Sequence, residues 1–147
     1  MTDKLRVLVL CTGNSARSQM AEGWLRRLGE GRVEAFSAGT HPAPAVNPLA
    51  VQVMGEVGID LSGQRPKSVE GFLGRQLDYV ITVCDDAAEV CPIFPGPVQR
   101  IHWSFQDPAK VEGDEAARLA TFRRVRDGLR ERLESFLSEA PVGSANA

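Results

Sequence analysis

The chain has 147 residues, of which 43% are hydrophobic and 24% charged, and this is the size and composition of a single globular domain. Its 17 basic and 19 acidic side chains give a net charge of −2 without a long run of one sign, which argues against partners such as nucleic acid or an anionic membrane surface. We expect one domain over residues 1–139 and a flexible tail over residues 140–147.

The cellular location is indicated by the hydropathy pattern and by the cysteines. The first four residues are mostly polar and lead directly into an apolar run, unlike a secretory signal, and no stretch approaches the roughly 18 apolar residues of a membrane-spanning helix. The cysteines are Cys11, Cys84 and Cys91, and an odd number leaves at least one thiol free. Such thiols are typical of a reducing compartment. We therefore expect a cytoplasmic protein without membrane contact, and we expect a monomer.

Strands and helices are predicted to alternate along the chain. Short aliphatic and β-branched runs predict four strands, at residues 6–10, 33–38, 78–83 and 98–102. Helical spacing of apolar residues predicts helices over 17–28, over 48–57 after the Asn47-Pro48 cap signal, near 69–73, and in a long final helix. The apolar stripe of that final helix consists of Leu119, Phe122, Val125, Leu129, Leu133 and Phe136.

This alternation predicts an α/β fold, a three-layer sandwich whose central four-stranded parallel sheet is flanked by helices on both faces. In such folds, ligands bind at the carboxyl ends of the strands. Cys11 ends the first predicted strand, Cys84 follows the third, and Asp107 follows the fourth. We therefore expect these three side chains to face one crevice.

The turn between the first strand and the first helix has the features of an anion-binding site. Its residues are Cys11, Thr12, Gly13, Asn14, Ser15, Ala16, Arg17 and Ser18. Backbone N–H groups and the helix N-terminus attract an oxyanion there, and the planar fork of Arg17 suits two of its oxygens. The same field is expected to lower the pKa of Cys11 from its usual value of about 8.5, with Ser18 donating to the thiolate. A cysteine at a strand end is more often a small buried residue, but this complete segment favours a nucleophile.

Asp107 is the candidate general acid, because a departing oxygen needs a proton and the loop contains no histidine. In the sequence Gln106-Asp107-Pro108, the proline favours an extended conformation at Asp107. Taken alone, Asp-Pro is more often only the start of a turn. No role is assigned to His41 or His102.

The segments VLCTGNSARSQMAEGW, SAGT, VITVCDDAAEVCP and HWSFQDPA resemble the thioredoxin-coupled arsenate reductases. That family shares its fold and phosphate-binding loop with low-molecular-weight protein tyrosine phosphatases. The resemblance extends from Val7 through the final helix. The first segment fits both groups, whereas Cys84 and Cys91 favour the reductases.

The resemblance implies a relay of three thiols that reduces arsenate for arsenic detoxification. Cys11 attacks arsenate while residues 12–18, Arg17 included, bind its oxygens, and Asp107 protonates the departing hydroxyl. Cys84 then attacks Cys11 and expels arsenite, Cys91 attacks Cys84, and thioredoxin reduces the resulting disulfide. No bound cofactor is implied, and phosphate or sulfate would compete with arsenate.

The spacing of the last two cysteines adds an expectation about movement. A helix over residues 85–90 would place Cys84 and Cys91 ~10 Å apart, whereas a disulfide tolerates Cα separations of about 7 Å at most. We expect this segment to unwind on oxidation.

The resemblance also implies that some members of the family bind potassium beside the loop. The matching residues are Asn14 and Glu22, together with a threonine and an aspartate after Ser62, where this chain has Arg65 and Lys67. This difference argues against a potassium site and suggests that Lys67 supplies a fixed charge instead. A second departure is Ala16, where many relatives carry a further cysteine, and it leaves the relay intact.

Two alternative functions remain open. A phosphatase for phosphotyrosine or a small phosphate ester would use Cys11, Arg17 and Asp107 and release its thiophosphate intermediate with water, although residues 39–48 lack the aromatic side chains that grip a tyrosine ring. A non-enzymatic binder of arsenite or a soft metal would use the thiols but leave Arg17 and Asp107 without a role.

Overall fold

The computed structural model describes residues 4–85 and 93–140. Four strands form one parallel sheet in the order β2-β1-β3-β4. Their bounds are β1 Leu5–Cys11, β2 Val33–Gly39, β3 Tyr79–Thr82 and β4 Gln99–His102. The helices are α1 Arg17–Leu28, α2 Pro48–Glu56 and α3 Glu115–Glu139, with the short 3-10 helices η1 Val69–Phe72 and η2 Pro108–Lys110. The predicted parallel α/β sandwich is confirmed.

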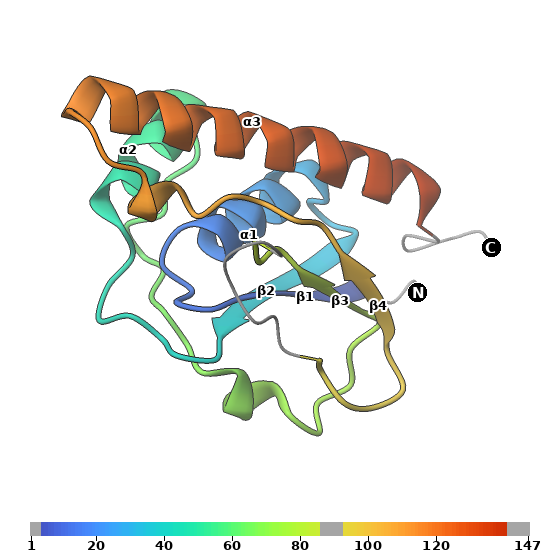
Figure 1. Ribbon diagram of the computed structural model, residues 1–147. Helices are drawn as coiled ribbons and strands as arrows, with labels where there is room; N and C mark the ends of the chain where they lie inside the picture. Colours follow the sequence, from blue (N-terminus) through green and yellow to red (C-terminus); the bar gives the residue numbers. More distant parts are fainter. Residues whose placement is uncertain (1–3, 86–92, 141–147) are drawn as a thin grey trace.

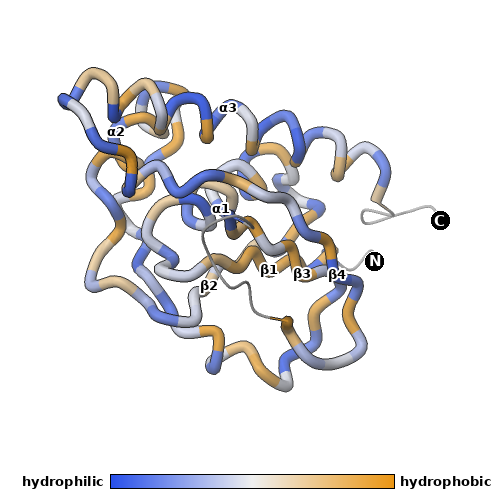
Figure 2. Tube along the Cα trace, in the orientation of Figure 1, coloured by the Kyte–Doolittle hydropathy of each residue, from blue (hydrophilic) through white to orange (hydrophobic). Residues whose placement is uncertain are grey.

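The two faces of the sheet carry different covers (Figure 1). Val7 and Val9 of β1 pack into a core shared with α1, α2 and α3, whereas Leu8 and Leu10 point to the other face, because successive strand residues alternate. That second face is covered by η1 and by loops, and Phe72 is part of its core. Figure 2 shows hydrophobic residues along β1 and β3, in keeping with their position inside the sheet.

The predicted helix signals act locally as expected. The side chain of Asn47 accepts a hydrogen bond of 2.8 Å from the Leu49 N–H, and Pro48 begins α2. Gly29 ends α1, its N–H bonding to the Leu25 carbonyl at 2.9 Å. Four predicted elements are shorter than expected: α2 stops at Glu56, β3 loses one residue at each end, β4 begins at Gln99 instead of residue 98, and the helix near residues 69–73 is a single 3-10 turn.

The topology places a switch point at the carboxyl end of β1. The chain passes from β1 to its neighbour β2 on one side and continues to β3 on the other. Crevices form where connections diverge in this way, and ligands bind in them. Cys11 is the last residue of β1 and therefore lies at this point.

Within the described residues, no helix has both the length and the apolar character needed to cross a membrane. The division into a domain over residues 1–139 and a tail stays a prediction, since residues 141–147 lie outside the described residues.

Candidate active site

The loop between β1 and α1 is held in shape by the segment that follows β2. The carbonyl oxygens of Thr12, Gly13 and Ser15 accept hydrogen bonds of 2.9, 2.9 and 2.8 Å from the backbone N–H groups of residues 41, 43 and 47. In a trans peptide the C=O and the following N–H point in opposite directions. The N–H groups of residues 13, 14 and 16 therefore point into the loop; that of residue 14 donates to the Cys11 sulfur, and those of residues 13 and 16 can donate to an anion.

Two backbone features make this loop possible. Asn14 has a φ of 51°, the left-handed conformation that helps successive N–H groups form an anion-binding concavity. Gly39 passes so close to the loop that a Cβ there would collide with the Thr12 carbonyl oxygen and lie 3.0 Å from the Asn14 nitrogen. The glycine of the SAGT segment is thus required by the approach of β2 to the loop.

The α1 N-terminus adds a further attraction for an anion. The preceding residue, Ala16, makes no side-chain cap, and the first N–H groups of a helix have no acceptor within the helix. These groups and the helix dipole face the end of the loop. An oxyanion bound there would provide the missing cap.

Cys11 is buried in this loop and its sulfur has two polar neighbours. The Asn14 N–H donates to Sγ at 3.2 Å, and Ser18 Oγ lies 2.8 Å from Sγ. Since Ser18 Oγ already accepts a bond of 2.7 Å from Asn14 Nδ2, its own hydrogen is free to donate to the sulfur. Both groups would stabilise a thiolate. The expected contact between Cys11 and Ser18 is therefore present.

Asn14 also connects the loop to a distant segment. Its Oδ1 accepts hydrogen bonds from Gln19 Nε2 at 3.0 Å and from the Lys67 N–H at 2.8 Å. Gln19 is fully buried and donates as well to the Arg65 carbonyl at 3.0 Å. Sequence reasoning missed Gln19. Gln19 lies almost opposite the apolar stripe of the predicted helix, where helical spacing predicts an exposed side chain, so the sequence carries no signal of its burial.

The residues expected around a potassium ion are occupied by protein donors instead. The buried Glu22 carboxylate accepts from Ser37 Oγ at 2.5 Å, pairs with Arg26, and lies 3.7 Å from Lys67 Nζ. With Asn14 Oδ1 also taken up, these residues do not fit a potassium ion. Within the described residues, no group of three or more His, Cys, Asp or Glu side chains could hold a metal.

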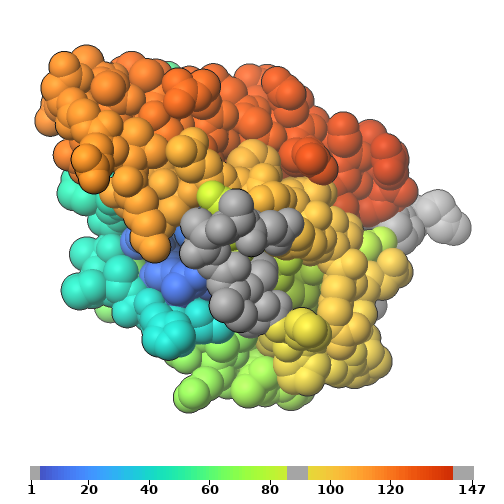
Figure 3. Space-filling view, in the orientation of Figure 1, coloured from blue at the N-terminus to red at the C-terminus, as the bar shows by residue number. Residues whose placement is uncertain are grey.

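A pocket of about 450 Å³ opens above the loop. Figure 3 shows the blue surface of the loop between the cyan segment near residue 40 and the orange segment near residue 110. The pocket is lined by Cys11, Thr12, Gly13, Ser15, Ala16, Arg17, Thr40, His41, Asp107 and Lys110. Sequence reasoning assigned no role to Thr40, His41 or Lys110.

Arg17 and Asp107 meet at the wall of this pocket. The Arg17 side chain is only 3% exposed, and its Nη2 lies 3.6 Å from Asp107 Oδ2. Its Nη1 donates to the Phe105 carbonyl at 3.1 Å and to the Val83 carbonyl at 3.4 Å. Arg17 thus bridges the segments that follow β3 and β4. The other oxygen of Asp107 caps η2 by accepting from the Ala109 N–H at 3.0 Å.

The three side chains expected in one crevice are only partly brought together. Cys11 and Asp107 line the pocket, whereas Cys84 is fully buried and is absent from the lining formed by the described residues. Cys84 is disulfide-bonded, and Cys11 is a free thiol. Of the helix considered over residues 85–90, residues 86–90 lie outside the described residues, as does Cys91.

Fold and site together define a parallel α/β protein that presents a cysteine and an arginine in an oxyanion-binding loop. The family described as low molecular weight phosphotyrosine protein phosphatase matches residues 6–144. The chain belongs to this family.

Within this fold, several similar proteins are arsenate reductases. An arsenate reductase from Halalkalibacterium halodurans is 46% identical over 134 residues, which cover 91% of this chain and 96% of that protein. A solved structure described as an arsenate reductase in the phosphate-binding state has a TM-score of 0.75 and 33% identity, covering 92% of this chain and 98% of its own. A thioredoxin-dependent arsenate reductase from Corynebacterium glutamicum has a TM-score of 0.68 and 28% identity, covering 93% of this chain and 64% of its own. The resemblance inferred from the sequence is confirmed.

Proposed function

We propose that this protein reduces arsenate to arsenite through a relay of thiols that thioredoxin regenerates. The observation that carries the proposal is the free thiol of Cys11 inside an oxyanion loop, in a chain whose Cys84 is disulfide-bonded. Phosphate-ester hydrolysis through Cys11 needs no second cysteine, whereas a thiol relay passes through an oxidised Cys84. The proposal is supported by the arsenate reductases among the similar proteins.

The first step is attack by the Cys11 thiolate on arsenic. The inward N–H groups of the loop and the guanidinium of Arg17 hold the arsenate oxygens, and Asp107 gives its proton to the departing hydroxyl, which leaves as water. A bond between sulfur and arsenic(V) forms as one arsenic–oxygen bond breaks. The contact between Arg17 and Asp107 keeps the acid beside the oxyanion site.

The second step reduces arsenic. The Cys84 thiolate attacks the sulfur of Cys11, the electron pair of the sulfur–arsenic bond passes to arsenic, and arsenite leaves behind a Cys11–Cys84 disulfide. Cys91 then attacks Cys84 and releases the Cys11 thiolate. Thioredoxin supplies the two electrons that reduce the last disulfide. A free Cys11 together with an oxidised Cys84 corresponds to the state before that final reduction.

The relay is tested by counting arsenite in single-turnover reactions of reduced protein without thioredoxin. Wild type and Cys91→Ser are expected to release one arsenite for each chain, the variant being trapped as the Cys11–Cys84 disulfide. Cys11→Ser and Cys84→Ser are expected to release none. With thioredoxin, its reductase and NADPH present, only wild type is expected to turn over repeatedly. Sustained turnover by Cys84→Ser would contradict the relay.

Phosphate-ester hydrolysis is the second candidate activity, because it needs only Cys11, Arg17 and Asp107. The pocket lining offered by the described residues contains no Phe, Tyr or Trp side chain to hold an aromatic ester, so we propose a weak side activity at most. Fast hydrolysis of a phenyl phosphate, unaffected by Cys84→Ser and Cys91→Ser, would make the phosphatase the main activity and arsenate reduction the weaker candidate. The same assay reports whether those variants are folded.

We further propose that phosphate and sulfate compete with arsenate for the loop, that the protein acts in the cytoplasm as a monomer, and that no potassium ion is needed because Lys67 faces Glu22. A non-enzymatic arsenite binder is the less favoured alternative, since it leaves the contact between Arg17 and Asp107 without a purpose. Arsenite binding without any arsenate turnover would favour it.

A further inference from the structure

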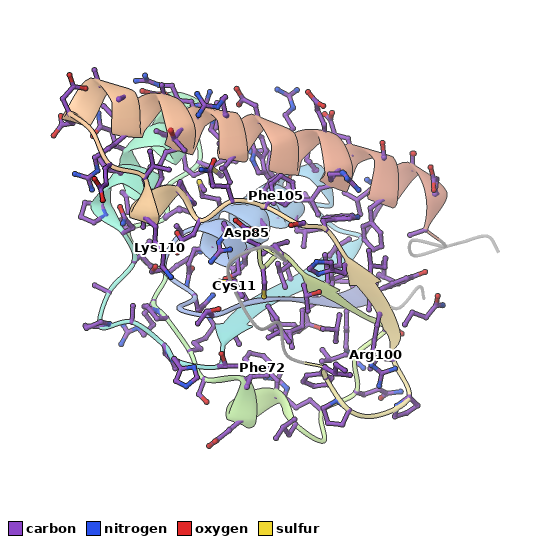
Figure 4. All side chains as sticks on the ribbon, viewed as in Figure 1. Cys11, Phe72, Asp85, Arg100, Phe105 and Lys110 are labelled. Atoms are coloured by element: carbon purple, nitrogen blue, oxygen red, sulfur yellow. The ribbon has the colours of Figure 1, made fainter. Side chains whose placement is uncertain are left out.

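Lys110 lines the oxyanion pocket without a part in the relay. The pocket of about 450 Å³ is far larger than an anion of five heavy atoms. An anion held by the loop and Arg17 would therefore fill only part of it. Figure 4 shows Lys110 on the segment after β4, near Cys11 of the loop, and both residues belong to the same lining. The pocket therefore has a second cationic residue besides Arg17.

The turn that Asp107 caps fixes where Lys110 lies. The Lys110 N–H donates to the Asp107 carbonyl at 3.2 Å, and the side chain of Asp107 caps the same 3-10 turn. Residues three apart in such a turn lie on the same side. A side chain beside Asp107 is therefore directed toward the pocket that Asp107 lines.

The charge of Lys110 is not used elsewhere. Within the described part of the chain, its ammonium forms no ion pair and no hydrogen bond, whereas Arg17 is engaged by Asp107 and by two backbone carbonyls. An exposed lysine is a mobile point charge on a flexible stem. Such a charge at the mouth of a pocket raises the local concentration of anions and slows their escape.

We propose that Lys110 is a further substrate-binding residue, whose ammonium at the pocket mouth attracts and retains the doubly charged oxyanion that Cys11 attacks. This inference rests on the proposed function for the identity of the substrate. It concerns binding, so Lys110 affects KM and leaves the thiol chemistry, and hence kcat, unchanged.

Calorimetric titration of the reduced protein with inorganic phosphate tests the proposal without turnover. Lys110→Gln is expected to raise the Kd for phosphate roughly three- to ten-fold at low ionic strength, and this difference is expected to shrink in molar salt, where the Debye length is about 3 Å. Lys110→Arg keeps the charge and is expected to bind like wild type. The matched control is Lys4→Gln, an exposed lysine beside the amino end of β1, which is expected to change nothing.

Arsenate kinetics then separate the two proposals. A rise in KM with constant kcat in Lys110→Gln is expected. The role of Lys110 would be overturned if the Kd for phosphate were unchanged in Lys110→Gln, or if it rose equally in Lys4→Gln. Normal phosphate binding by a wild type that does not reduce arsenate would refute the proposed function alone, and the role of Lys110 in oxyanion binding would still be decided by the titration.

Discussion

Glu22 and Glu56 each meet two cationic side chains, but in different surroundings. The Glu22 side chain is 2% exposed, with Arg26 and Lys67 beside it, whereas the Glu56 side chain is 35% exposed. Lys67 also donates its backbone N–H to Asn14 in the oxyanion loop. The Glu22 cluster is therefore one contact away from the residues that bind the anion.

The Glu56 cluster joins helices instead. Arg123 and Arg126 of α3 donate to the two carboxylate oxygens of Glu56 at 2.7 to 3.0 Å, and Arg126 also donates to the Val53 carbonyl at 2.9 Å. Together with the bond of 3.0 Å from Trp24 Nε1 to the Arg126 carbonyl, these contacts fasten α1 and α2 to α3. Similar charge pairing thus supports the site in one region and the helical layer in the other.

Substituting one glycine beside the oxyanion loop and one in the helical layer is expected to give the largest difference in activity between the two regions. Gly39→Ala places a methyl group against the loop, which costs about 1–3 kcal/mol by overpacking and lowers kcat/KM roughly ten- to hundred-fold, because the cradle shifts. Gly55→Ala in α2 meets no atom within 4 Å and is expected to stabilise by about 0.5–1 kcal/mol with unchanged activity. Thermal unfolding and arsenate kinetics measure both. Equal activity of the two variants would contradict the role assigned to Gly39.

The carboxylates themselves give the next largest effect. Glu22→Gln removes the buried partner of Lys67, and we expect a stability loss of about 1–3 kcal/mol and a kcat/KM roughly three- to ten-fold lower as the Asn14 contact loosens. Glu56→Gln is expected to reduce stability only, because none of its partners touches the loop. Urea unfolding and phosphate titration of each variant distinguish the two. Weaker phosphate binding by Glu56→Gln would remove the contrast.

How much of this could be predicted from the sequence depends on the range of the contacts. The nucleophile loop and the Asn47-Pro48 helix start are local signals, and the structure has both. The bonds that hold the loop in place join residues far apart, such as Lys67 and Asn14, which are 53 positions apart. No periodicity encodes such a pairing. The position of Lys67 beside Glu22 was suggested only by the family resemblance.

Cys84 shows where a strand-end argument stops. Residue order correctly places it just beyond β3, at the carboxyl edge that also holds Cys11. The direction of its side chain depends on packing, and that packing buries Cys84 completely, outside the described lining of the pocket. An edge of a sheet can therefore be predicted from the sequence, whereas the set of side chains that share one cavity cannot.

A smaller effect is expected from the monovalent cation. Because Lys67 Nζ lies 3.7 Å from Glu22 and the neighbouring oxygens already accept from protein donors, replacing sodium by potassium at constant ionic strength should change the wild-type rate by less than roughly two-fold. Lys67→Gln removes the fixed charge and is expected to lower kcat/KM in both salts, with Lys4→Gln as the matched control. If potassium strongly raised the rate of the wild type, this would contradict the proposal that the Lys67 ammonium takes the place of a potassium ion.

The smallest effect concerns Glu56 and acid. Hydrogen bonds from Arg123, and less so from Arg126, lower the pKa of Glu56 from 4.5 to about 2. A carboxylate with a lowered folded-state pKa stabilises the protein above its unfolded pKa, and this contribution is lost as the pH falls toward the folded pKa. The Tm difference between wild type and Glu56→Gln should therefore be constant at neutral pH, decline below about pH 4.5 and vanish near pH 2. A difference that persisted at pH 2 would show that Glu56 acts through packing and not through its charge, and the contrast with Glu22 would then lie in burial alone.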